Sequence, residues 1–334
     1  MQPDYKILAD DVDVTAAIRP NLVSLTVVDE AGLQTDTCEI VLNDTGGAIE
    51  LPKRGVALKV SLGYAGALVP KGTFIVDEVE PASPPQTLTI RAKAADNAGT
   101  DGKACPLKDR HTRSWDNKPL KDIFGDIAAG AKLTLRLHPS LAGKIRDHWD
   151  QTGDSDSATA MRLAHAEGGE MKIAGGCMII YPQGSGMTSS GAPMPAISLV
   201  PEDGTSWKVT VADREKYASV AASYYDPQLA KTVTVEAGDP DGVTLALRGD
   251  YPDPTAALSA AKARLGALQR GAAVLHMEMP GKAALAAECP VTLTGFRRGG
   301  GVDGTWVATH VEHTIIGSSG FRTVFDAEVP GVTI

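Results

Sequence analysis

Alternation of apolar and polar residues over the first hundred positions is the feature that most constrains what this chain can fold into. Leu58, Val60 and Leu62 alternate with the polar Lys59 and Ser61, and this period of two puts every second side chain on one face of a β-strand. More strands are predicted at 73–79 and 87–94, and two more apolar faces are formed by Val23, Leu25 and Val27 and by Cys38, Ile40 and Leu42. Short strands separated by turn-forming runs predict a small barrel or sandwich over residues 1–100.

Residues 101–172 change to a helical spacing, which predicts a small α+β insert. An apolar stripe at intervals of three and four follows Pro119, a residue suited to a first helical turn. A second helix is predicted at 157–167, capped by Asp154 or Ser155 and ended by Gly168-Gly169. A strand is predicted between them at 133–137. The stripe consists of Leu120, Ile123, Ile127 and Ala131.

Strand signals return over residues 173–334, which predicts a second β unit. The glycine-, serine- and proline-rich stretch 184–195 is predicted to be a loop. A helix is predicted at about 254–270, because Asp253 is a good N-cap, Pro254 suits the first helical position and Gly271 ends the apolar stripe. Strands are predicted at 177–181, 197–200, 206–211, 218–225, 232–236, 244–247, 274–279, 291–294, 305–314 and 323–329. The chain is therefore expected to be mainly β with an α+β insert.

Charge and cysteine usage narrow the function. The chain has 32 basic and 41 acidic residues, which argues against a tightly held nucleic acid, because phosphate contacts need clustered Lys and Arg. The net charge is −6 over residues 1–100 and +3 over 101–150, so a domain boundary is predicted near residue 100. No apolar run is long enough for a membrane span, and no export signal is expected at the start. Four widely spaced cysteines, Cys38, Cys105, Cys177 and Cys289, predict neither zinc nor a disulfide framework, and Cys38 and Cys289 are expected to be buried in strands.

Two motifs resemble metal sites, and both are interpreted as ordinary structure. His310 and His313 flank Glu312, but in a strand positions 310 and 313 point to opposite faces. Residues 239–242, Asp-Pro-Asp-Gly, lack the third acidic position and the later Glu of a calcium loop. A plain turn is the preferred interpretation there, and no metal site is predicted.

Three further patterns are weak candidates for catalysis or cofactor binding. Residues 295–304 are glycine-rich but lack Gly-Lys-Ser/Thr and a following helix, so Arg297 and Arg298 are expected on an exposed hairpin. Gly184-Ser185-Gly186 lies in a loop and is no nucleophile elbow. Asp154 and Asp156 are interpreted as helix-start residues. No catalytic, cofactor-binding or metal residue is predicted, and the protein is expected not to be an enzyme.

An ordered series of segments resembles the phage late control protein D family, the tail hub of contractile-tailed phages. In the N-terminal half it consists of YKILADDVDVTAAIRPNLVSLTVVDEAGLQTDTCEIVLND, LPKRGVALKVSLGY and KGTFIVDEVEPASPPQTLTIRAKAAD. In the C-terminal half it consists of DPTAALSAAKARLGALQRG and CPVTLTGFRRGGGVDGTWVATHVEHTI. The similarity covers nearly the whole chain and is weakest over 184–195.

The resemblance implies a structural protein related to the T-even phage hub and to the hub portion of VgrG proteins. It implies two tube-like β-barrel domains, at 1–100 and 173–334, joined by a connecting domain at 101–172. Three subunits would form a pseudo-sixfold ring between a hexameric tail tube, or its distal initiator protein, and a trimeric spike. Other baseplate proteins would be neighbours, DNA and tape-measure protein would pass through the channel, and no membrane or cofactor is implied. The location implied is the virion baseplate, assembled in the bacterial cytoplasm.

Three alternatives stay open at this level. A cell-wall hydrolase is disfavoured because no acid/base or metal constellation is evident. A carbohydrate-binding module is disfavoured because aromatic residues make up only 5% of the chain and offer few stacking platforms. The hub of a related contractile injection or secretion apparatus is compatible with every feature above.

Overall fold

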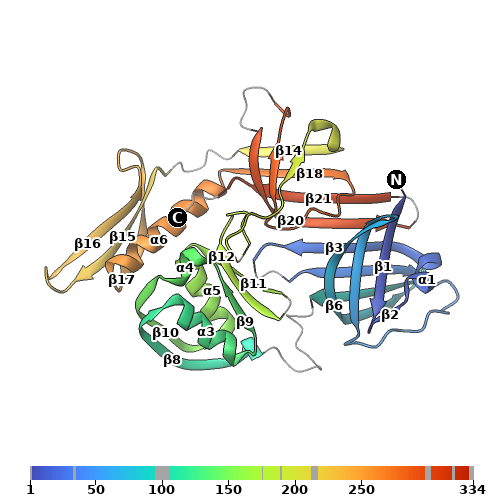
Figure 1. Ribbon diagram of the computed structural model, residues 1–334, viewed down its shortest axis with the longest axis horizontal. Helices are drawn as coiled ribbons and strands as arrows, with labels where there is room; N and C mark the ends of the chain where they lie inside the picture. The colour runs from blue at the N-terminus through green and yellow to red at the C-terminus, as the bar shows by residue number, and fades with distance from the viewer. Residues whose placement is uncertain are drawn as a thin grey trace.

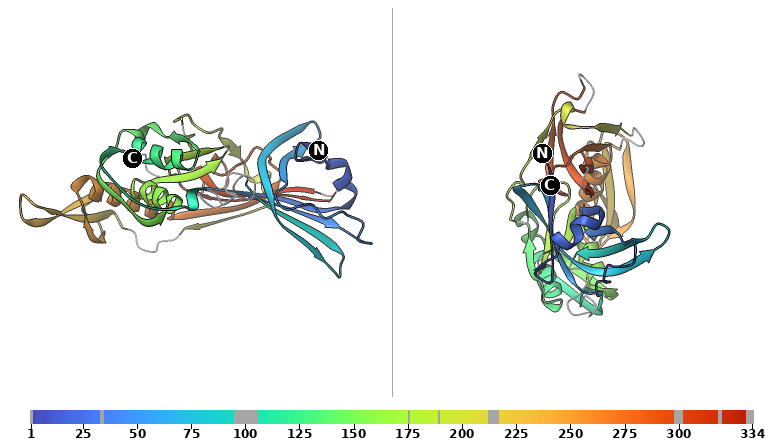
Figure 2. Two further views of the ribbon diagram at one scale, coloured as in Figure 1. Left: turned by 90° about the horizontal axis from the view of Figure 1, so that it is seen from below. Right: turned by 90° about the vertical axis from the view of Figure 1, so that its right-hand side faces the viewer.

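The computed structural model describes residues 2–32, 35–94, 106–174, 176–188, 190–211, 217–297, 302–317 and 320–330. Strands dominate (Figure 1), so the predicted mainly β class with an α+β insert is confirmed. The first unit lies at one end of the long axis, and a three-stranded sheet with its helix lies at the other (Figure 2). No helix among the described residues has the length and apolar content needed to cross a bilayer.

The first unit, residues 2–94, folds around the alternating faces expected from the sequence. Leu58, Val60 and Leu62 are all buried in its core, as are Cys38 and Ile40. Strand Thr87–Ala94 has the predicted bounds, whereas the strand predicted at 73–79 extends over Ala67–Ala82. The elements are β1 (Pro3–Ala9), β2 (Val12–Asp13), α1 (Thr15–Ile18), η1 (Arg19–Asn21), β3 (Leu22–Glu30), β4 (Thr37–Asn43), β5 (Ala57–Tyr64), β6 (Ala67–Ala82) and β7 (Thr87–Ala94).

One predicted face in this unit is wrong at its first residue. Leu25 and Val27 are buried, but Val23 is 42% exposed. The β3–β4 register shifts between Leu22 and Ser24, so Leu22 takes the inward position in place of Val23. A β-bulge inserts one residue and thereby reverses the faces on one side of it.

The connecting unit, residues 106–182, packs its two longer helices against a three-stranded sheet and a two-stranded sheet. Helix α3 buries Leu120, Ile123 and Ile127 as predicted, and Ser155 caps α5 by accepting a hydrogen bond from Ala158 N. The antiparallel two-stranded sheet of β8 and β10 was not predicted. The elements are η3 (Pro106–Lys108), β8 (Arg110–Pro119), α3 (Leu120–Gly130), β9 (Thr134–Leu137), α4 (Pro139–Ala142), β10 (Ile145–Ser155), α5 (Asp156–Ala166), β11 (Gly169–Ala174) and β12 (Cys177–Pro182).

The boundary expected at residue 172 passes through β11. Strand β12 pairs antiparallel with β11 and parallel with β9, so both strands complete the sheet of the connecting unit. Ile173, Met178 and Ile180 are buried in the same core as α3 and α5. In packing terms the connecting unit therefore runs to residue 182. The boundary expected near residue 100 lies outside the described residues.

The second unit, residues 190–330, has its own apolar core around Leu275, Trp306 and Phe325. Inserted within it is a subdomain that we call the flap, in which the sheet β16-β15-β17 packs on α6. Helix α6 begins after Asp253, whose carboxylate accepts from Ala256 N, and ends at Gly271 as predicted. The elements are β13 (Ile197–Leu199), η4 (Pro201–Asp203), β14 (Ser206–Val211), β15 (Ser219–Asp226), β16 (Lys231–Gly238), β17 (Thr244–Tyr251), α6 (Pro254–Arg270), β18 (Ala273–Pro280), β19 (Pro290–Leu293), β20 (Gly304–Ile316) and β21 (Gly320–Glu328).

A single sheet runs through both β units. Its order is β14-β18-β21-β20-β3-β4-β7-β6-β5-β1-β2, with β19 and β13 branching from β20. The units meet where β20 pairs antiparallel with β3, so that His313 lies opposite Val27. Among the described residues this path does not close on itself, and each β unit is one half of a shared, curved sheet.

Candidate functional site at the junction of the three units

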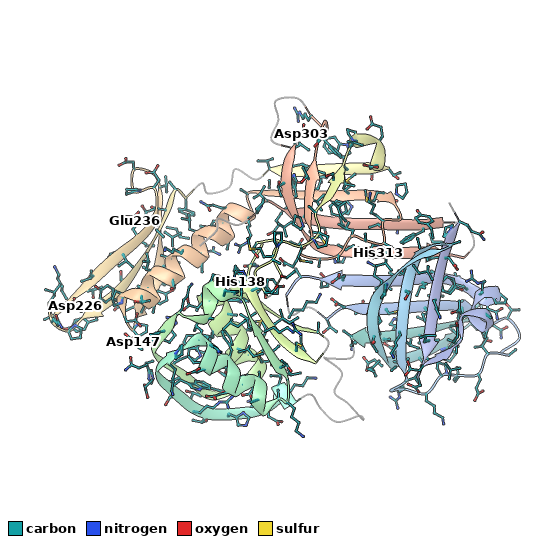
Figure 3. The ribbon with its side chains drawn as sticks, in the orientation of Figure 1. His138, Asp147, Asp226, Glu236, Asp303 and His313 are labelled. Atoms are coloured by element: carbon teal, nitrogen blue, oxygen red, sulfur yellow. The ribbon has the colours of Figure 1, made fainter. Side chains whose placement is uncertain are left out.

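His313 lies buried in the joint between the first and second units (Figure 3). Its Nε2 is 2.9 Å from Nζ of Lys71 on β6, and its Nδ1 is 2.9 Å from Oγ1 of Thr323. Lys71 also donates to the Leu285 carbonyl at 3.0 Å. Burial and then the charge of Lys71 lower the pKa of His313 to about 3. The ring is therefore neutral at physiological pH, and its Nε2 also lies 3.0 Å from the Leu285 carbonyl.

His310 lies on the opposite face of the same strand. Its Nδ1 is 2.9 Å from Oε1 of Glu30 on β3. The two histidines consequently have different partners, as the strand interpretation predicted. Within the described ranges no group of three or more His, Cys, Asp or Glu side chains converges on one point.

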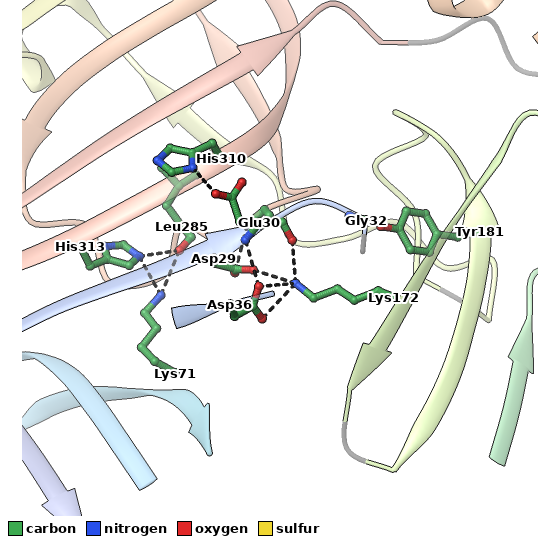
Figure 4. Close-up of polar contacts among 11 residues, drawn as sticks. Asp29, Glu30, Gly32, Asp36, Lys71, Lys172, Tyr181, Leu285, His310 and His313 are labelled. Atoms are coloured by element: carbon green, nitrogen blue, oxygen red, sulfur yellow. Dashed lines mark hydrogen bonds and ion pairs between the residues drawn. The ribbon is translucent and has the colours of Figure 1, made fainter. Parts of the chain in front are cut away.

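Lys172 of β11 ties the connecting unit to the first unit (Figure 4). Its Nζ lies 2.8 Å from Oδ1 of Asp29, 2.9 Å from the Glu30 carbonyl and 3.2 Å from Asp36. Burial by itself would lower the pKa of Lys172, but the charges of Asp29 and Asp36 outweigh it and the pKa is raised. Asp29 Oδ2 also accepts from Ala287 N at 3.1 Å. One carboxylate therefore contacts all three units.

The turn after β3 makes a second contact with the connecting unit. Gly32 N donates to the Tyr181 hydroxyl at 3.2 Å. Gly32 has φ +71, and a Cβ there would stand 2.7 Å from the Glu170 side chain. Only glycine suits both the left-handed backbone and this close approach. The place of Gly32 in the junction therefore explains its residue type.

A cleft of about 880 Å³ opens beside this junction, between α5, α6 and the adjoining ends of β3, β20 and β21. Glu288 lines it and is buried, and its Oε2 has no hydrogen-bond partner among the described residues. Burial and then the charge of Glu170 raise the pKa of Glu288 to about 7. Arg270, also buried, donates to Gln183. Glu288, Arg270 and Gln183 line the cleft where α6 of the flap meets the connecting unit.

The remaining sequence candidates lie away from the junction. Asp154 forms a surface ion pair with Arg162, whereas Asp156 at the start of α5 is 1% exposed and accepts from Arg113, Gln151 and His111. Asp239 accepts from Asp241 N in a plain turn. In the hairpin loop before β20, Asp303 accepts from Gly295 N and Phe296 N. Arg297 is exposed, and Arg298 lies outside the described residues.

The described cysteines, Cys38, Cys177 and Cys289, form no disulfide with one another. Cys38 is buried in β4, and burial raises its pKa to about 12. Cys289 is buried as expected but precedes β19, so its predicted place in a strand is wrong by one residue. Cys105 lies outside the described residues.

Sequence comparison decides the family. A model described as phage tail baseplate hub (GPD) matches residues 89–318. The chain is also 34% identical, over 372 aligned positions, to a probable baseplate hub protein of Escherichia phage P2, with 98% of this chain and 94% of that protein covered. The chain belongs to the phage tail baseplate hub (GPD) family. The resemblance drawn from its segments is therefore confirmed, and this hub protein is a component of the virion tail.

Other relatives agree with this assignment. A probable baseplate hub protein of Escherichia phage 186 is 33% identical, with 98% of this chain and 93% of that protein covered. The fold is also similar to the 43 kDa tail protein of prophage MuSo2 from Shewanella oneidensis, with a TM-score of 0.71, 14% identity and 98% of both chains covered. An Escherichia coli component of the type VI secretion system has a TM-score of 0.52 at 13% identity, with 93% of this chain and 73% of that chain covered.

Proposed function

We propose that three copies of this hub protein form a pseudo-sixfold ring that joins the hexameric tail tube to the trimeric central spike. The observation that carries the proposal is the order of strands in the shared sheet. Eight neighbours, β6-β7-β4-β3-β20-β21-β18-β14, alternate strictly in direction because every pair is antiparallel. Because the series has an even number of alternating strands, its two end strands, β6 and β14, run in opposite directions. The β14 of one copy can therefore pair antiparallel with the β6 of the next copy.

Both ends of this series have an open edge. Strand β5 pairs with β6 only as far as Ile75, so residues 77–82 of β6 pair with β7 alone. Strand β14 pairs with β18 alone in the described part of the chain. Three copies would join into 24 strands, and at ~4.8 Å per strand the circumference is about 115 Å and the diameter about 37 Å. That leaves room for a channel inside the ring.

The two edges also complement each other. Trp207 and Val211 of β14 are 38% and 66% exposed although Met277 and Ala273, opposite them on β18, are buried. A neighbouring strand would cover this apolar side. Lys208 lies on the opposite face of β14. Residues 77–82 of β6, which pair with β7 alone, include Glu78 and Glu80. Exposed edges otherwise invite unspecific pairing.

The other parts of the proposal follow from a hub in this position. The tube or its distal initiator protein, the spike and other baseplate proteins would be its neighbours, and DNA and tape-measure protein would pass through its channel. Assembly would take place in the host cytoplasm. We also propose a purely structural role without catalysis, which a turnover assay on peptidoglycan would test. The polar clusters of the protein support a structural role, because they connect its units. Each group in the cluster around Lys172 already takes part in a structural contact.

Cysteine cross-linking in intact tails tests the ring. Glu80→Cys on β6 is combined with single cysteines at 207–211 on β14, and oxidation is expected to give covalent trimers. Glu80→Cys with Arg248→Cys on the outer strand of the flap is the matched control and should remain monomeric. Dimers, an open ladder of larger species, or a mass corresponding to six copies would contradict the ring. So would a tail structure with the two β units of one subunit in different rings.

A second candidate is the hub of a related injection or secretion apparatus. The similarity in fold to the type VI secretion component supports it. Because the two functions share one architecture, the genes beside this one distinguish them: tail, capsid and terminase genes support the phage, and secretion genes without a capsid support the apparatus.

A further inference from the structure

The eight-strand series has a second, mostly polar face on the side opposite the cores. Residues directly opposite each other on neighbouring strands share a face. One row across the sheet consists of Glu78, Arg91, Glu39, Thr26, Thr314 and Arg322. Another consists of Glu30, His310, Asp326, His276 and Lys208. The residues between these positions, such as Ile90, Leu25 and Phe325, form the buried cores.

Carboxylates outnumber cations on this face. By register it carries eight carboxylates and four lysines or arginines. The carboxylates are Glu30, Glu39, Glu78, Glu80, Glu278, Glu312, Asp326 and Glu328, and the cations are Lys93, Arg91, Lys208 and Arg322. The acidic excess expected from the composition of residues 1–100 thus extends over strands of both units.

The two arginines of the face, Arg91 and Arg322, form ion pairs with these carboxylates. Arg91 on β7 lies between two neighbours, with Nε 2.9 Å from Oε2 of Glu39 and Nη1 2.7 Å from Oε2 of Glu80. Glu78 is 3.4 Å from the same guanidinium. Arg322 similarly lies 3.5 Å from Glu278 and 3.7 Å from Glu312. Lys93 pairs with Asp77 of the β6 bulge at 2.5 Å.

We infer that these cross-strand carboxylates are shields, which keep Arg91 and Arg322 from binding the phosphates of a DNA duplex passing along the face. The inference rests on the proposed ring. Because both cores lie on the other side of the sheet, an open channel in that ring is lined by the polar face. Tight DNA binding requires Lys and Arg free to replace counterions on phosphates. The shields occupy these cations, and the carboxylate excess repels the duplex.

The test uses the purified chain and a fluorescent DNA duplex in low salt. The shield variant carries E39Q, E78Q, E80Q, E278Q and E312Q, which free both arginines. Its affinity for the duplex is expected to rise at least tenfold over wild type. Each phosphate contact contributes about −0.9 to the slope of log K against log salt, so two freed arginines should give about −2. Adding R91Q and R322Q to the shield variant should abolish the gain.

The control variant has the same change in net charge, made at carboxylates outside the polar face. It carries E50Q, E202Q, D239N, D147N and D226N, and the last two positions lie on the connecting unit and the flap (Figure 3). Equal affinity of the shield and control variants would overturn the inference. Persistent binding after R91Q and R322Q would also overturn it, because the gain would then not come from these cations.

The DNA-binding measurement can be made on a single chain and does not require the ring to form. Arg91 and Glu78 are 43% and 59% exposed in a single chain, so the duplex can reach the face in a monomer. Failure of cross-linking would contradict the proposed ring, and failure of the DNA gain would contradict the shields. Exposed ion pairs contribute little to folding. If the five substitutions together prevent folding, the variant with E39Q, E78Q and E80Q alone should show a slope of about −1 from one arginine.

Discussion

Replacing Lys172 by methionine should loosen the connecting unit from the first unit. The substitution keeps the aliphatic stem and removes the ammonium that Asp29, Asp36 and the Glu30 carbonyl share. The two carboxylates would then face each other without a cation at a site where all three side chains are only about a fifth exposed. Burial, with the charge of Asp29, already raises the pKa of Asp36 in the wild type.

The expected loss is about 2–4 kcal/mol. Removing one partner of a fully buried ion pair costs about 3–5 kcal/mol, and the residual exposure of these side chains reduces that. A chain of several units need not unfold in one step, so the measurement is hydrogen exchange at the backbone amides of β3 and β11. One reporter is Glu30 N, which donates to Asp36 Oδ1 at 3.0 Å.

Two further variants make the result decisive. Lys59→Met removes an exposed pair with Asp11, whose side chains are 50% and 74% exposed, and should cost at most about 1 kcal/mol. Asp36→Asn in the Lys172→Met background should restore at least half of the lost protection, because it removes one of the two uncompensated charges. Equal protection in Lys172→Met and Lys59→Met would refute the role of this cluster.

Three other predictions use different parts of the molecule. Leu58→Asp buries a charge at a site that is 5% exposed and should cost several kcal/mol; the melting temperature should fall sharply, and an unchanged value would show that the strand face is wrongly assigned. Burial raises the pKa of Glu288 from 4.5 to about 7, so the folded state binds this proton more tightly than the unfolded state and stability falls as pH rises between these values. Glu288→Gln should accordingly be more stable than wild type at pH 8 by up to about 3 kcal/mol and equal to it at pH 4, as urea titrations at the two pH values would show. Finally, metal content measured by mass spectrometry should stay at background in the wild type and in the His310→Ala, His313→Ala double variant, whereas stoichiometric zinc lost on substitution would contradict the strand interpretation.

Local patterns determined much of the secondary structure. Asp253, Pro254 and Gly271 mark the ends of α6, because helix caps depend on a few adjacent residues. The faces of β4 and β5 follow directly from alternation. By contrast, β8 was missed because its ten residues bury only Trp115 and show no alternation. The bulge that exposes Val23 also could not be predicted from the sequence pattern, since it arises from pairing with another strand.

The junction and the shared sheet were decided by tertiary structure. Lys172 resembles any lysine in a short strand, and its partner Asp29 is 143 residues away in sequence. The pairing of β3 with β20 likewise joins Glu30 to His310 across 280 residues. The sequence by itself determined a mainly β chain, the ends of α6 and, through resemblance, its family. It could not specify which strands pair or which charges meet, because caps and alternation act between near neighbours, whereas register and ionic contacts depend on where distant segments are brought together by packing.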